Sequence, residues 1–112
     1  MRTRGARDRG KRRLVRFSSG AQVHPIVATR WAGRLSPRIV IAANDGYLPG
    51  RTNFAVRCRD TIDLVAWLRG LPFTPPPDAE YAHGHARATG GSLPPAAFEA
   101  FITTLGFSSA EP

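Results

Sequence analysis

Cysteine is nearly absent from this chain of 112 residues, and that absence excludes several kinds of protein. Cys58 is the only cysteine, so no disulfide can form within the chain, and zinc sites built from several cysteines are excluded. No apolar run approaches the roughly 20 residues of a membrane-spanning helix. No apolar stretch of about 7–15 residues follows the basic start, as it would in a secretory signal. We therefore expect a cytoplasmic protein with no membrane partner.

Acidic residues are scarce, with 8 Asp and Glu against 16 Lys and Arg and a net charge of +8. The imbalance is local, because residues 1–16 hold eight of the basic residues and one acid, a net charge of +7. Residues 17–112 hold the other eight basic residues and seven acids, so they are nearly neutral. A self-repelling block without apolar periodicity predicts a disordered basic tail over 1–16. The sequence leaves open whether this tail is a phosphate-binding arm or simply solvated.

Residues 17–112 are predicted to form a single α/β domain, a small sheet with flanking helices. Apolar residues at a spacing of four predict a helix that begins near Pro25 and ends near Pro37. A β-branched run and an alternating run predict a hairpin pair of strands over 38–43 and 53–59. Beyond them we expect a helix with an acidic start at 60–63 and a stop at Gly70, a proline-rich loop, one further strand, and a last helix over 94–105.

The stretch His-Gly-His-Ala-Arg-Ala-Thr-Gly-Gly-Ser, residues 83–92, carries the most chemical information. Glycines let the backbone approach a ligand and expose N–H groups to an anion, and histidine can donate hydrogen bonds to phosphate oxygens. The stretch lacks the Gly-Lys-Ser/Thr of a P-loop and the spacing of a dinucleotide fingerprint. Taken alone, it is either an anion-binding loop or a plain tight connection.

Three segments in this order resemble one known family. They are Asn-Phe-Ala-Val-Arg-Cys at 53–58, the acidic-led helix Ile-Asp-Leu-Val-Ala-Trp-Leu at 62–68, and Gly-His-Ala-Arg-Ala-Thr-Gly-Gly-Ser at 84–92. Together they resemble the DHH-associated C-terminal domain of the DHH phosphoesterases, in the branch of the RecJ-like exonucleases. The resemblance covers roughly residues 23–107.

The match to the family motifs is partial. Arg57 falls on the arginine of an S-x-R-S-like motif, with Cys58 where serine is usual. Gly84 and His85 fall on the Gly-His pair of the motif G-G-H-x-x-A-A-G, in which His83 replaces a glycine. Ala88-Thr89-Gly90 falls on A-A-G, with threonine in place of an alanine. His24-Pro25 and the helix after it look like the H-x-G-V helix of RecJ-like members, without its glycine.

The resemblance implies a substrate-binding module. Arg57 would clamp a phosphate, because a planar guanidinium holds two oxygens at once, and His85 would donate to a phosphate or a base edge. The alternatives are a surface strand arginine and a structural turn histidine, and His24 is interpreted as a helix-start residue rather than a ligand. The candidate phosphate-binding residues are Arg57, His83, Gly84, His85, Thr89, Gly90 and Gly91.

The resemblance also implies that hydrolysis happens elsewhere. In the family a separate domain bearing the D-H-H triplet binds two divalent metal ions, and this chain contains no such triplet. We therefore expect no catalytic residue, metal site or cofactor in this chain. Manganese or magnesium would belong to a DHH catalytic domain, in a partner chain or in upstream sequence. The expected ligands are single-stranded nucleic acid, an oligonucleotide or a nucleotide; the alternative is a small protein-interaction domain with a basic tail.

Overall fold

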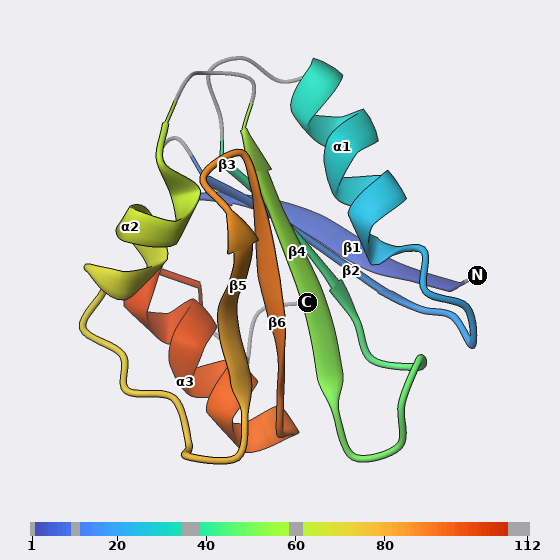
Figure 1. The fold of residues 1–112 in the computed structure, drawn as a ribbon. Coiled ribbons are helices and arrows are strands. Elements are labelled where there is room, and N and C mark those ends of the chain that lie inside the picture. Colours follow the sequence, from blue (N-terminus) through green and yellow to red (C-terminus); the bar gives the residue numbers. More distant parts are fainter. Residues whose placement is uncertain (1, 10–11, 35–38, 59–61, 108–112) are drawn as a thin grey trace.

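The structure, a computed structural model, describes residues 2–9, 12–34, 39–58 and 62–107 (Figure 1). It is an α/β domain, as the sequence predicts. Its elements in chain order are β1 (Arg2–Arg9), β2 (Arg12–Ser18), α1 (His24–Arg34), β3 (Ile39–Asn44), β4 (Thr52–Cys58), α2 (Leu64–Arg69), β5 (Glu80–His85), β6 (Ala88–Leu93) and α3 (Pro95–Thr104).

The six strands form one sheet in the order β1-β2-β3-β4-β6-β5. β2 and β3 run parallel, joined by α1, and every other neighbouring pair is antiparallel. All six residues of β3 are buried, which is typical of a strand covered on both faces. β3 pairs antiparallel with β4 from Ile39 opposite Cys58 to Asn44 opposite Asn53, so the predicted pairing of these two strands is confirmed.

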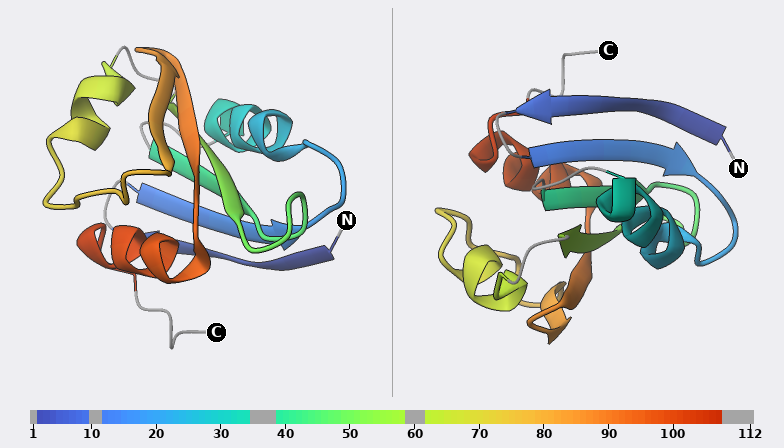
Figure 2. Two further views of the ribbon diagram at one scale, coloured as in Figure 1. Left: turned by 60° about the horizontal axis from the view of Figure 1, so that its bottom comes forward. Right: turned by 90° about the horizontal axis from the view of Figure 1, so that it is seen from above.

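Helices cover both faces of the sheet, α1 on one side and α2 with α3 on the other (Figure 2). The larger core lies on the α2–α3 side. It contains Phe54, Phe98, Phe101 and Phe107, each no more than 1% exposed, together with leucines and isoleucines from strands and helices. On the α1 side two smaller clusters join short side chains such as Ala42 and Ala55 to α1.

The helix boundaries follow the predicted signals. The side chain of Asp63 caps α2 by accepting a hydrogen bond from the Ala66 N–H at 3.0 Å, so the acidic start is Asp63 itself, while Asp60 lies outside the described residues. Gly70 closes the same helix. Pro95 occupies the first turn of α3, where its missing N–H removes no helical hydrogen bond.

The prediction of a disordered tail over 1–16 is wrong for the described residues. β1 pairs with β2, and β2 lies inside the sheet beside β3. Leu14, Val15 and Phe17 are at most 3% exposed, so their burial stabilises the strand. The basic residues around them keep this strand from being recognised in the sequence. The expected boundary between residues 16 and 17 therefore falls within β2, and the strand belongs to the domain.

The glycine-rich stretch forms two strands rather than the single one expected. β5 and β6 make an antiparallel hairpin that turns at Ala86 and Arg87, and β6 pairs with β4. The hairpin is irregular between Glu80 and His83, where Ala82 has a positive φ of 57°. It brings the predicted Gly-His segment alongside the strand that carries Arg57.

Candidate functional site

Arg57 lies near the end of β4 on the side of the sheet that α1 covers. It alternates with Asn53 and Ala55, and Ala55 packs in the α1-side cluster, so the three side chains share that face. The Arg57 Nη1 donates to two backbone carbonyls, Val56 O at 2.8 Å and Thr89 O at 3.0 Å. These bonds tie the guanidinium to β6 and hold it in one place.

Among the side chains that the structure describes, no acidic group pairs with the positive charge of Arg57. Burial lowers the pKa of its guanidinium. A partly desolvated cation is stabilised most by a charged hydrogen-bond acceptor. The surroundings of Arg57 thus favour an anion.

A concave pocket of about 280 Å³ lies between the start of α1 and the strands β4, β6 and β5. Arg57 forms part of its wall, together with glycine, histidine and polar residues from α1 and the strands. The full lining is Gln22, His24, Pro25, Asn53, Phe54, Ala55, Arg57, Glu80, His83, Gly84, Ala88, Thr89, Gly90 and Gly91. The pocket therefore brings together six of the seven predicted binding residues.

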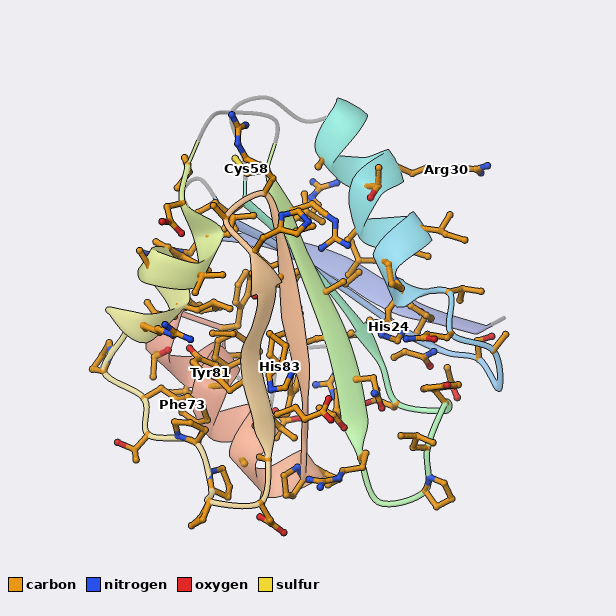
Figure 3. All side chains as sticks on the ribbon, in the orientation of Figure 1. His24, Arg30, Cys58, Phe73, Tyr81 and His83 are labelled. Atoms are coloured by element: carbon orange, nitrogen blue, oxygen red, sulfur yellow. The ribbon has the colours of Figure 1, made fainter. Side chains whose placement is uncertain are left out.

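His24, interpreted from the sequence as a helix-start residue, begins α1 and also lines the pocket. Its side chain is 5% exposed, and its Nδ1 is buried without a hydrogen-bond partner. Burial, and then the charge of Arg57, lowers the pKa of His24, so the imidazole is neutral at pH 7. Figure 3 shows His24 at the foot of α1 and His83 on β5.

Asn53 is a site residue that the sequence reasoning did not identify. It is 8% exposed, and its Oδ1 is buried without a partner. Its cross-strand partner Ser92 is 6% exposed, and the Ser92 Oγ also has no partner. Buried polar atoms are usually hydrogen-bonded, so this pair marks a place where a ligand or water would bind. The one signal in the sequence was that Asn53 is polar and on the same alternating face as Arg57.

The glycines of β6 let strands approach each other. A Cβ on Gly90 would collide with the backbone of Phe54, and a Cβ on Gly91 with the backbone of Glu80. Gly84 has a φ of +106°, and a Cβ there would meet the Ala88 carbonyl. Gly90 is therefore required by the packing of β6 against β4, and Gly84 and Gly91 by the packing within the hairpin. The three glycines also line the pocket, where they leave the backbone bare.

Thr89 and His85 lie differently from their predicted roles. The hydroxyl of Thr89 donates to the His83 carbonyl at 2.6 Å, so it is already engaged within the hairpin. His85 is outside the pocket of Arg57 and lines a second concavity of about 700 Å³, shared with residues of α2 such as Arg69. The expected placement of His83 and His85 in a single site is therefore not what the structure shows; Gly84 borders both cavities.

Metal ligands do not gather in this part of the chain. Among the residues that the structure describes, no group of three or more His, Cys, Asp and Glu side chains lies close enough to hold a metal ion. In the same residues no helix is both long and apolar enough to cross a membrane.

No protein-family model matches the chain, and no curated protein matches it.

Proposed function

We propose that this domain binds the phosphate of a nucleotide or single-stranded nucleic acid in the pocket beside α1, as the binding module of a DHH-type, RecJ-like phosphoesterase in the cytoplasm. The observation that carries the proposal is Arg57, a partly buried cation that is fixed by two carbonyls and paired with no carboxylate in the described residues. Such an arginine offers its remaining N–H groups to a phosphate.

Two further features support an anion at this place. The N-terminal end of α1, which carries the positive end of the helix dipole, borders the pocket at His24 and Pro25. The glycine backbone of β6 forms the opposite wall, which lets a bulky phosphate approach the strand closely. A phosphate bound there would be contacted from both sides of the pocket.

In this proposal the domain holds the substrate and contributes no catalytic group. Cleavage would belong to a metal-dependent DHH domain, on a partner chain or elsewhere in sequence, with manganese or magnesium bound by that domain. The residues of this chain position the phosphate and keep it oriented, which lowers the entropic cost of the reaction that the partner domain catalyses.

The test compares two arginines that differ in their surroundings. Fluorescence anisotropy of a short labelled single-stranded oligonucleotide is titrated with the full chain at physiological salt, because removing 1–16 would cut through β2. We expect Arg57→Gln to weaken binding at least about tenfold, the effect of losing a charged hydrogen bond. The matched control is Arg30→Gln, which removes the same charge from an exposed position on α1 (Figure 3).

The control separates a specific site from general attraction between a basic protein and a polyanion. We expect Arg30→Gln to change the dissociation constant less than about twofold. Equal losses in the two variants, with both variants still folded, would mean that the pocket does not bind phosphate. An unchanged oligonucleotide affinity in Arg57→Gln would favour the alternative, a small protein-interaction domain.

A further inference from the structure

The pocket has two chemically different ends. Arg57 marks one end, and Asn53 lies four residues away on the same strand, a separation of about 13 Å along a strand at ~3.3 Å per residue. That span is comparable to one extended nucleotide from its phosphate to the far edge of its base. The volume of about 280 Å³ also suits one nucleotide unit rather than a length of strand.

The Asn53 end carries two acceptors, the Asn53 Oδ1 and the Glu80 carboxylate, beside the Ser92 hydroxyl, which can accept or donate a hydrogen bond. Glu80 pairs with Ser92, and Ser92 pairs with Asn53, so the three residues lie side by side on β5, β6 and β4. Asn53 and Glu80 both line the pocket. The Asn53 Oδ1 and the Ser92 Oγ are buried without partners, and the carboxylate of Glu80 accepts hydrogen bonds and cannot donate them when ionised.

Acceptors at this end call for a ligand that donates. Of the four common bases, guanine is the one whose Watson–Crick edge carries two adjacent N–H donors, at N1 and N2. Adenine, cytosine and uracil each place an acceptor beside their donor, and that acceptor would face the Glu80 carboxylate. Unstacked bases are commonly recognised on this edge, and an unmatched pairing leaves a buried polar atom unsatisfied.

We propose that the pocket is selective for guanine nucleotides, with the phosphate at Arg57 and the N1–H and N2–H₂ edge of guanine at Asn53 and Glu80. The proposal rests on the phosphate-binding function proposed above and adds the identity of the base. Arg57 supplies affinity for any nucleotide, whereas Asn53 and Glu80 supply the preference among bases.

The experiment measures the affinity of the full chain for GMP, IMP, AMP and UMP by isothermal titration calorimetry. Inosine monophosphate is the sharpest comparison, because it differs from GMP only by the missing N2 amino group. We expect GMP to bind at least about fivefold more tightly than each of the other three, the lower end of the discrimination from a bidentate base contact.

Two variants assign that preference to residues. Glu80→Gln changes an exposed side chain and keeps its shape, and Asn53→Ala removes the buried acceptor. We expect each to reduce the ratio of GMP to AMP affinity, because the groups that favour guanine are lost. Arg57→Gln serves as the contrasting variant, since it is expected to weaken all four nucleotides by a similar factor.

The outcomes separate the two proposals. If all four nucleotides bind equally well, or if Glu80→Gln and Asn53→Ala leave the ratio of GMP to AMP affinity unchanged in folded protein, the base preference is overturned and the phosphate site stands. If none of the four binds the wild-type chain, the guanine proposal is overturned, and the oligonucleotide titration with Arg57→Gln decides whether the phosphate site stands. A preference for GMP that both variants abolish supports them together.

Discussion

The two faces of the sheet are built for different purposes. The α2–α3 face carries a closed aromatic core, in which the Phe101 ring lies 5.0 Å from Phe54 and 5.7 Å from Phe98, centroid to centroid. The α1 face carries small alanine-rich clusters and a pocket whose walls hold unpartnered polar atoms. The second face places the unpartnered polar atoms of His24 and Asn53 at a pocket, where a ligand can satisfy them.

Two arginines, Arg16 and Arg57, illustrate the contrast between the two faces. Arg16, on β2, donates from Nη1 to Glu99 at 2.8 Å and from Nη2 to Asp45 at 3.1 Å, and its guanidinium lies 5.2 Å from the Phe98 ring centroid. Burial by itself lowers the pKa of Arg16, but the hydrogen bonds to Glu99 and Asp45 outweigh it and raise the pKa overall. Burial lowers the pKa of Arg57, and no carboxylate of the described residues offsets it.

The difference teaches how to tell a structural cation from a binding cation. Both side chains are partly buried and both sit on strands of the same sheet. Arg16 is paired with two carboxylates from elsewhere in the chain, so its charge is balanced within the fold. Arg57 is held by neutral carbonyls, which position the guanidinium without neutralising it.

The largest loss of stability is expected from a substitution in the aromatic core of the α2–α3 face. Phe101 is fully buried among aromatic rings, so Phe101→Ala leaves a cavity and should lower the free energy of unfolding by about 3–5 kcal/mol. Urea denaturation followed by tryptophan fluorescence measures this loss. The same variant, where still folded, should bind nucleotide as the wild type does. A loss of affinity as large as that of Arg57→Gln would show that the two faces are not separate.

A smaller effect should distinguish the two arginines. Arg16→Gln leaves Asp45 and Glu99 without their common partner, and we expect it to reduce stability by about 2–3 kcal/mol. Arg57→Gln loses two hydrogen bonds to carbonyls, for which about 1 kcal/mol is expected. For nucleotide affinity the order should reverse, with Arg57→Gln the more harmful. The comparison fails if the two variants rank the same way in urea denaturation and in calorimetry.

Much of the fold could be predicted from the sequence because its signals are local. Continuous apolar and β-branched residues identify β3, and proline and glycine mark the ends of α2 and α3. β2 could not be predicted in this way. Its inward Arg16 is neutralised by Asp45 and Glu99, which lie 29 and 83 residues further along the chain, so the strand looks like a charged tail until the chain is folded.

The candidate site could be predicted in part for a similar reason. The Gly-His segment and Arg57 carry recognisable patterns, and they do meet at one pocket. Asn53 and Glu80 become neighbours only through the pairing of each with Ser92, which no short motif records. His85 is predicted from the sequence to bind in the same site but lines the other cavity, next to the hairpin turn between β5 and β6.

The smallest expected effect is a pH dependence of stability, which tests whether the α1 face holds a neutral histidine. The pKa of His24 is lowered in the folded chain, by burial and then by Arg57, so between that value and the ordinary value of about 6.5 the unfolded chain binds more protons. The stability due to neutral His24 is therefore complete above about pH 6.5 and is lost as pH falls toward the folded pKa.

Urea denaturation from pH 7.5 to 5.5 should show this decline in the wild type and less of it in His24→Gln. A bound phosphate would favour the protonated ring, so saturating GMP should reduce the decline in the wild type. An identical pH profile in the two proteins would mean that His24 titrates as an ordinary exposed histidine, and that the pocket does not desolvate it.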